Sequence, residues 1–234
     1  MSGGSDIGSI SYGSSGAYST GWNSSSRNTN DYYQYSITAA NGYNLTVSNI
    51  SFYHSKFYSG TDNGAVYYST NSFTSSTQLG SDFGITSSQT SFSNSTSISV
   101  PSGTTLTIRV YAWNLYSSEN FYNETFVITG TTVAAASITT GTISGSPFCP
   151  GESVSVPYTI SGTFNSGNVF TAQLSSSTGS FTSPTDIGTL TSTSAGTISA
   201  TIPVGASAGT GYRIRVISSN PSVTGTNNGS NLTI

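Results

Sequence analysis

The sequence predicts an all-β chain folded as two tandem antiparallel β-sandwiches. Its 234 residues suit two domains of about 100 residues each. Apolar and polar residues alternate over short stretches, as is typical of half-buried strands, and turn-forming residues separate these stretches about every 8–12 residues. No stretch shows sustained helical periodicity.

The composition excludes a disordered chain and argues against two kinds of partner. Charged residues account for 6% of the chain and the net charge is −3, whereas 34% of the residues are hydrophobic and 12% are aromatic. A disordered chain needs low hydrophobicity, few aromatic residues and a high net charge. The five Lys and Arg residues are scattered, so no basic patch is expected to bind nucleic acid. No apolar run approaches the roughly 18 residues of a membrane helix, so we expect no membrane insertion.

The weakly charged, Ser/Thr-rich surface indicates an extracellular or cell-surface location. The opening residues Met1–Ser5 lack the charged and apolar segments of an export signal, which we therefore expect elsewhere in a longer chain. The single cysteine, Cys149, excludes an internal disulfide. We expect it to be a small buried apolar residue. A disulfide to another chain, or to a segment outside this sequence, is the alternative.

The first strands follow a Gly/Ser-rich opening. Tyr33–Ile37 alternates between apolar and polar residues and is expected to be a strand. The pair Asn41-Gly42 predicts a hairpin turn after it. The next strand, Leu45–His54, changes phase between Val47 and Ile50, which predicts a β-bulge or a bend.

Asp62-Asn63-Gly64 is expected to turn the chain into a strand at Ala65–Ser69. The composition changes over Thr131–Ser137, after which tyrosines almost vanish, so we place a domain boundary there. The two domains are then residues 1–133 and 134–234. Further strands are expected at residues 97–100, 106–113, 124–129, 153–160, 169–174, 197–202, 211–217 and 231–234.

Six segments of the second domain carry a family pattern, namely Phe148–Gly151, Val154–Tyr158, Gly162–Asn165, Phe170–Ser175, Gly211–Val216 and Ser218–Pro221. On these segments the domain resembles a repeated immunoglobulin-like module of secreted Bacteroidetes proteins. The resemblance implies a module that recurs in tandem within large exported adhesins and enzymes, often upstream of a type IX secretion signal. We therefore expect this chain to belong to a larger multidomain protein.

Four segments of the first domain carry a second resemblance, namely Asp31–Thr38, Leu45–Phe52, Tyr68–Phe73 and Ile108–Trp113. On these segments the domain looks like a jelly-roll module, similar to carbohydrate-binding modules, that occurs beside those repeats. The resemblance implies a fold and an extracellular setting, and it names no ligand.

We expect no enzymatic activity, because no catalytic constellation is visible. His54 is the only histidine, and without a nucleophile motif we expect it to be a hydrogen-bonded structural residue. A glycosidase needs two carboxylates about 5–10 Å apart in a cleft. The acidic residues fall instead mostly in expected turns and at strand ends; they include Asp31, Asp62, Asp82, Glu119 and Glu124.

We also expect no cofactor. One histidine and one cysteine, in different domains, are too few for a zinc site. A structural calcium is the alternative, because oxygen ligands abound and jelly-roll modules that bind sugars often hold one. Its candidate ligands are Asp6, Asp31 and Glu124.

The strand Leu106–Trp113 carries the candidate binding residues. Its aliphatic residues occupy the even positions and are expected to face the core. Because side chains alternate between faces, Arg109, Tyr111 and Trp113 then form a row on the outer face. Aromatic planes suit the apolar face of a sugar ring, and polar groups suit its hydroxyls.

A neighbouring strand is expected to add Tyr53 and Lys56 to this row. The tip is expected to add Tyr116, Glu119 and Asn120. The leading hypothesis is a non-catalytic adhesion module that binds a polysaccharide or surface glycan. One alternative is that the rings pack beneath the N-terminal segment, for example beneath Trp22. A related alternative is that both domains are stalk or spacer units of a large adhesin or polysaccharide-degrading enzyme.

The second domain has no comparable row. Arg213 and Arg215 alternate with apolar residues and are expected on a solvated face, where a charged pair discourages association at a sheet edge. We therefore interpret this domain as a spacer.

Overall fold

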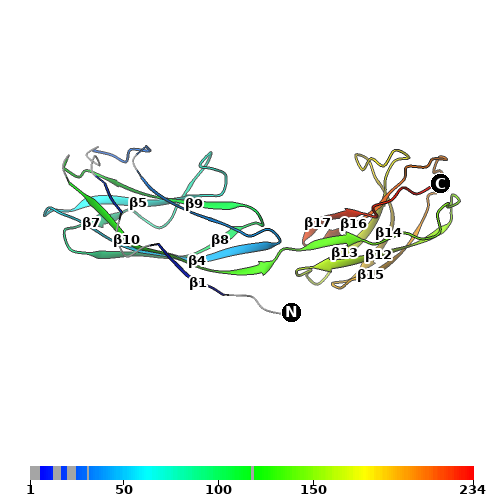
Figure 1. Cartoon of the computed structure of the whole chain (residues 1–234), viewed down its shortest axis with the longest axis horizontal. Helices are drawn as coiled ribbons and strands as arrows, with labels where there is room; N and C mark the ends of the chain where they lie inside the picture. Colours follow the sequence, from blue (N-terminus) through cyan, green and yellow to red (C-terminus); the bar gives the residue numbers. More distant parts are fainter. Residues whose placement is uncertain (1–5, 13–16, 20–24, 31, 117–118) are drawn as a thin grey trace. The chain divides into compact units, whose positions relative to one another are not determined.

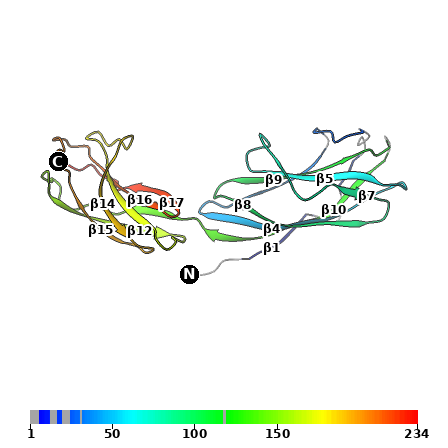
Figure 2. The same cartoon turned by 180° about the vertical axis from the view of Figure 1, so that it is seen from behind.

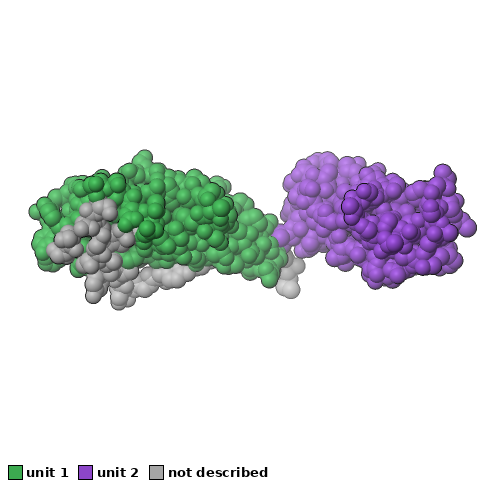
Figure 3. All heavy atoms as spheres, turned by 90° about the horizontal axis from the view of Figure 1, so that it is seen from above, with its two compact units in different colours: residues 1–133 green, residues 134–234 purple. Residues whose placement is uncertain are grey.

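The structure, a computed structural model, describes residues 6–12, 17–19, 25–30, 32–116 and 119–234. Over these ranges the chain is all-β, as predicted, with several antiparallel sheets and no helix. None of the described segments forms a helix long and apolar enough to cross a membrane. The chain divides into two compact units, residues 1–133 and 134–234, which Figure 3 colours separately.

The first unit is a sandwich of two sheets, which lie one above the other in Figures 1 and 2. We call them the β4 sheet and the β9 sheet. The β4 sheet has the order β1-β10-β4-β8, with β2 paired to β10; its strands are β1 (Asp6–Tyr12), β2 (Ala17–Ser19), β4 (Tyr43–Lys56), β8 (Thr90–Val100) and β10 (Phe121–Ala134). The β9 sheet has the order β3-β9-β5-β6, with β7 paired to β5; its strands are β3 (Tyr33–Thr38), β5 (Asp62–Ser69), β6 (Thr77–Gln78), β7 (Phe83–Ile85) and β9 (Thr105–Trp113).

The connectivity of this unit is that of a jelly roll. Successive long strands alternate between the two sheets, and β10, the last strand, lies between β1 and β4. The described pairings within this unit are antiparallel. The chain crosses from one sheet to the other between the end of β4 and the start of β5. These two strand ends therefore lie together at the tip of the sandwich.

A stack of aromatic rings fills the space between the two sheets. The rings of Tyr35 and Phe126 lie parallel with centroids 3.7 Å apart, and Phe52 continues the stack 5.5 Å from Phe126. Phe92 extends it on the other side of Phe52, at 5.0 Å. Stacked pairs contribute about 0.5–1.5 kcal/mol each beyond the burial of their surface, so this stack fixes how the sheets face each other.

Two local predictions for the first unit need correction, and one is confirmed. The bulge is confirmed, because the register between β4 and β8 shifts between Val47 and Asn49. Asn41-Gly42 does form a turn, with Gly42 at φ 81°, but it links β3 to β4 in opposite sheets and closes no hairpin. Asp62–Gly64 is the start of β5 and pairs with β7, so the predicted turn there is wrong.

The second unit has immunoglobulin-like topology. One layer is β14-β13-β16-β17 and the other is β11-β12-β15; a parallel bridge between Thr139 and Thr226 joins β11 to β17 at the border. The strands are β11 (Ser137–Thr140), β12 (Ser153–Ser161), β13 (Val169–Leu174), β14 (Thr185–Thr191), β15 (Gly196–Thr201), β16 (Ile214–Ser219) and β17 (Ser222–Asn227). Alternating residues of both layers meet around the buried ring of Phe170, which packs on Tyr158 and Phe164.

Two predictions for the second unit are also wrong. Cys149 is exposed, because it lies in the turn that precedes Glu152 and donates its backbone N–H to that carboxylate. Arg215 belongs to β16 and Arg213 directly precedes it. Because β16 is an interior strand of its layer, neither arginine lies at a sheet edge. Arg215 instead packs over the ring of Phe181 at 4.5 Å, and both arginines are half-buried.

Candidate functional site

The strand expected to carry the binding row has the predicted alternation. Leu106, Ile108 and Val110 of β9 are fully buried in the core. Arg109, Tyr111 and Trp113 therefore project from the outer face of the β9 sheet. The even positions of β9 thus face the core and the odd positions face outward, as the sequence indicates.

Side chains of the same unit cover the centre of this row. Tyr111 is only 3% exposed, because the rings of Tyr32 and Tyr67 contact it edge-on at 5.8 and 5.7 Å. The guanidinium of Arg27 lies 4.0 Å above the ring of Tyr67 and 5.1 Å from that of Tyr111. Tyr111 therefore has little ring face left for a ligand.

Arg109 is half-buried and is also held by neighbouring side chains. Its guanidinium lies 3.9 Å from the ring centroids of both Tyr32 and Phe73, and its Nε donates a hydrogen bond to Gln34. Cation–π contacts of this kind contribute about 0.5–2 kcal/mol each. We call Arg27, Tyr32, Tyr67, Phe73, Arg109 and Tyr111 the arginine–aromatic layer. Trp113, at the end of the row, is half-buried, and Trp22, its expected cover, lies outside the described residues.

Tyr53 and Lys56 do not extend this row, contrary to expectation. Both belong to β4, which lies in the opposite sheet from β9. Tyr53 is exposed on the outer face of the β4 sheet, beside a hollow of about 400 Å³ lined mainly by Ser51, Ser91, Ser93, Thr125 and Val127. Lys56 points the other way, into the interior, because it has the same parity as the buried Phe52 and His54.

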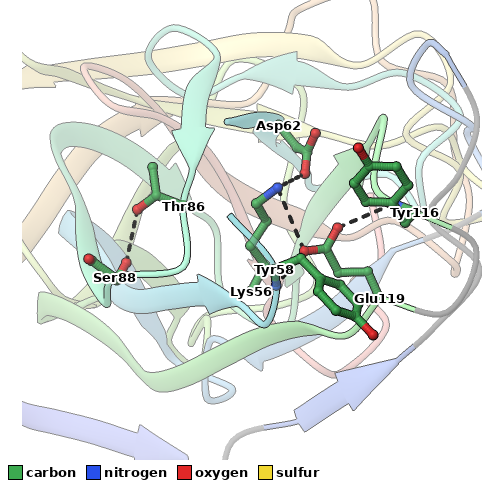
Figure 4. Close-up of polar contacts among 7 residues, drawn as sticks. All are labelled: Lys56, Tyr58, Asp62, Thr86, Ser88, Tyr116 and Glu119. Atoms are coloured by element: carbon green, nitrogen blue, oxygen red, sulfur yellow. Dashed lines mark hydrogen bonds and ion pairs between the residues drawn. The ribbon is translucent and has the colours of Figure 1, made fainter. Parts of the chain in front are cut away.

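Lys56, Asp62 and Glu119 form a buried ionic cluster, which we call the Lys56 cluster (Figure 4). Lys56 is 3% exposed and Glu119 is fully buried. The Lys56 ammonium contacts Asp62 Oδ2 and lies 3.6 Å from Glu119 Oε1. The cluster joins the end of β4, the start of β5 and the segment before β10, so it ties both sheets together at one end.

The Glu119 carboxylate also holds two loops. Its Oε1 accepts the backbone N–H of Tyr58 at 2.9 Å, and its Oε2 accepts that of Tyr116 at 3.2 Å. The Glu119 N–H in turn donates to the Tyr116 carbonyl oxygen at 2.8 Å. Hydrogen bonds to a buried charged acceptor are about twice as strong as neutral ones, so the loops after β4 and β9 are firmly placed.

Three exposed aromatic residues stand on these loops, and we call them the aromatic tip. Phe57, Tyr58 and Tyr116 are 68%, 47% and 69% exposed. The ring of Tyr58 meets that of Phe57 edge-on at 5.2 Å and that of Tyr116 edge-on at 6.4 Å. Each ring therefore keeps a face open to solvent, while the backbone beneath it is anchored on Glu119.

The structure thus brings together three of the residues singled out from the sequence, Lys56, Tyr116 and Glu119, at the tip of the sandwich. Phe57 and Tyr58 were missed. Their signal was available, because two adjacent aromatic residues that follow a strand end and precede a Ser-Gly pair are expected in a surface loop. Asp62 was missed as a partner because it was assigned to a turn.

Other polar candidates have ordinary structural surroundings. No group of three or more His, Cys, Asp or Glu that could hold a metal lies among the described residues. Asp31 and the side chain of Asp6, two of the expected calcium ligands, lie outside them, and Glu124 accepts a hydrogen bond from Gln89. His54 packs on Phe52 and Phe83, and its burial lowers its pKa to about 4.

Comparison with known proteins gives no family. No protein-family model matches the chain, and no curated protein matches it. The apo structure of β-glucuronidase from Ruminococcus gnavus aligns at 12% identity and a TM-score of 0.24, covering 80% of this chain and 32% of that one. The same enzyme in complex with D-glucuronic acid aligns at 13% identity and a TM-score of 0.23, covering 80% and 33%. The chain thus spans about a third of these enzymes, and such scores carry no functional argument.

Proposed function

We propose that the first unit is a non-catalytic extracellular module that binds a glycan or a cell-surface polymer through the aromatic tip. The observation that carries this proposal is the combination of exposed aromatic rings with loops anchored on a buried carboxylate. Exposed rings that merely resulted from a poorly packed loop would need no such anchor. A fixed tip loses little conformational freedom on binding, and this lowers the cost of association.

The chemistry of the aromatic tip suits a sugar chain. The rings offer apolar faces for the CH face of a pyranose, and the phenol groups of Tyr58 and Tyr116 can donate to or accept from its hydroxyls. Lys56, the cation near the tip, is paired with Asp62 inside its cluster and therefore offers no free positive charge to an acidic sugar. A neutral polysaccharide is therefore the favoured ligand class.

The setting of the module is proposed from the family resemblance described above. We place the chain outside the cell, as part of a large exported Bacteroidetes protein of the type IX system, and assign the second unit as a spacer. The weakly charged surface supports this setting.

Affinity gel electrophoresis on a panel of neutral and acidic polysaccharides tests the binding proposal. The wild-type chain is expected to be retarded by at least one neutral polysaccharide, and the Tyr58→Ala/Tyr116→Ala variant is expected to migrate as in a gel without polysaccharide. Tyr43→Ala is the matched control, because Tyr43 is an exposed tyrosine at the opposite end of β4. Unretarded wild-type protein on every polysaccharide would reject the proposal.

A structural stalk is the second candidate, and the arginine–aromatic layer favours it. The row first expected to bind sugar is largely used to pack the segment around Arg27 and Tyr32 onto the β9 sheet. A stalk predicts equal migration of the wild-type chain and the Tyr58→Ala/Tyr116→Ala variant.

A further inference from the structure

Lys56 is the only lysine in the chain, and it is buried. Lysine is almost never fully buried unless it is paired, because desolvating an ammonium group is costly. Here it faces two carboxylates, those of Asp62 and Glu119, which are themselves buried. The cluster thus places one amine and two carboxyl groups together in a dry environment, with a net charge of −1 when all three groups are ionised.

We propose that Lys56 and Asp62 condense into an intramolecular isopeptide bond, with Glu119 as the catalytic proton carrier. The Lys56 Nζ is in direct contact with a carboxylate oxygen of Asp62, as Figure 4 shows. Both backbones are fixed, since Lys56 ends β4 and Asp62 begins β5. Holding two reacting groups in this way corresponds to effective concentrations of up to about 10⁵–10⁸ M.

The reaction balances without an oxidant or a co-reactant. A proton passes from the Lys56 ammonium to the Asp62 carboxylate, giving a neutral amine and a neutral acid. The amine lone pair attacks Asp62 Cγ and forms the C–N bond, while Glu119 accepts a proton from the nitrogen. Glu119 returns this proton to the departing hydroxyl, the C–O bond breaks, and water leaves. The products are an amide and one water molecule, and Glu119 ends as a carboxylate.

The geometry assigns different roles to the two acids. Glu119 lies 3.6 Å from the Lys56 nitrogen, and its two oxygens are held by the backbone N–H groups of Tyr58 and Tyr116. These bonds fix the position of the carboxyl group beside the Lys56 nitrogen, where it can take and return a proton. Asp62 is the acid whose carboxylate oxygen contacts the Lys56 nitrogen directly, so we assign it as the group that is attacked.

Burial favours the product over the ion pair. Desolvating two charged groups in a low-dielectric interior can cost more than their attraction returns, whereas an amide carries no net charge. The bond would also close the loop that carries Phe57 and Tyr58 and would link the β4 sheet to the β9 sheet covalently. The bond would form whether or not the aromatic tip binds a glycan.

Peptide mass spectrometry of the folded full-length chain tests the bond directly. Trypsin is expected to leave Lys56 uncleaved, and the peptide between Arg27 and Arg109 is expected to be lighter than its sequence by one water molecule. Because Lys56 is the sole lysine, an amine-reactive reagent applied to the denatured chain should label the α-amino group alone. A peptide of full mass, or labelling of Lys56, would overturn the proposal whether or not any variant folds.

Variants assign the roles within the cluster. Asp62→Ala and Glu119→Gln are each expected to restore the full mass and the labelling of Lys56, whereas the control Asp82→Ala, at an exposed acid, keeps the loss of water. Tryptophan fluorescence verifies that each variant is folded, because both tryptophans belong to residues 1–133. A loss of water that persists in Asp62→Ala would overturn the assignment of the bond, and one that persists in folded Glu119→Gln would overturn the role of Glu119.

Discussion

Replacing Glu119 with alanine is expected to destabilise the first unit severely. The fully buried carboxylate accepts two backbone N–H groups, those of Tyr58 and Tyr116. Hydrogen bonds to a charged group contribute about 1.5–3 kcal/mol each, so their loss lowers the free energy of unfolding by about 3–6 kcal/mol. Domains are typically stable by only about 5–15 kcal/mol, so the change removes a large part of the total. Loss of the proposed isopeptide bond would add to it.

Urea denaturation followed by tryptophan fluorescence measures this effect on the first unit alone, because Trp22 and Trp113 are the only tryptophans. With a slope of about 1–3 kcal/mol per molar urea, the midpoint should fall by at least about 1 M. Glu124→Ala is the control, since Glu124 is only partly buried and accepts a hydrogen bond from the exposed Gln89; its midpoint should stay within error of wild type. A Glu119→Ala midpoint equal to that of Glu124→Ala would refute the anchoring role of this carboxylate.

Three further predictions concern the core. Phe126→Ala interrupts the aromatic stack and should lower the free energy of unfolding by about 3–5 kcal/mol, measured by the same urea titration; a loss below about 1 kcal/mol would contradict the stack. Gly130→Ala should be destabilising, because a Cβ there would lie 2.4 Å from the Thr46 carbonyl oxygen, and a wild-type melting temperature would contradict this contact. Because the folded-state pKa of His54 is about 4 and its ordinary value is 6.5, the unfolded chain binds the proton first as pH falls. Stability should therefore decrease by about 1.4 kcal/mol per pH unit from about pH 6.5 towards 4, and His54→Leu should remove this slope.

Local alternation predicted the parts of the fold that depend on a single strand. The inward residues of β9 and the bulge in β4 follow from the order of side chains along one segment. Turn residues were less informative, because Asn41-Gly42 reverses the chain equally well within a sheet or between two sheets. Asp62–Gly64 has turn composition, yet β7 pairs with it and makes it a strand.

The candidate site was predicted less well, because it depends on contacts between distant segments. The strand pattern could place Tyr111 on an outer face, but the cover supplied by Tyr32 and Arg27 comes from some 80 residues earlier in the chain. Likewise, Lys56 was expected to be a surface cation because lysine usually is one. Only the meeting of three chain segments at the tip reveals its partners, Asp62 and Glu119.

The central claim is that binding resides at the aromatic tip. It is tested by measuring the dissociation constant of two variants for a polysaccharide that retards the wild-type chain. Tyr58→Ala/Tyr116→Ala should weaken binding at least about tenfold, since buried aromatic contacts of this kind contribute about 1–2 kcal/mol or more. Trp113→Ala, at the end of the row on the β9 sheet, should leave the constant within about twofold of wild type. The reverse pattern, with loss in Trp113→Ala and none in the tip variant, would contradict the account.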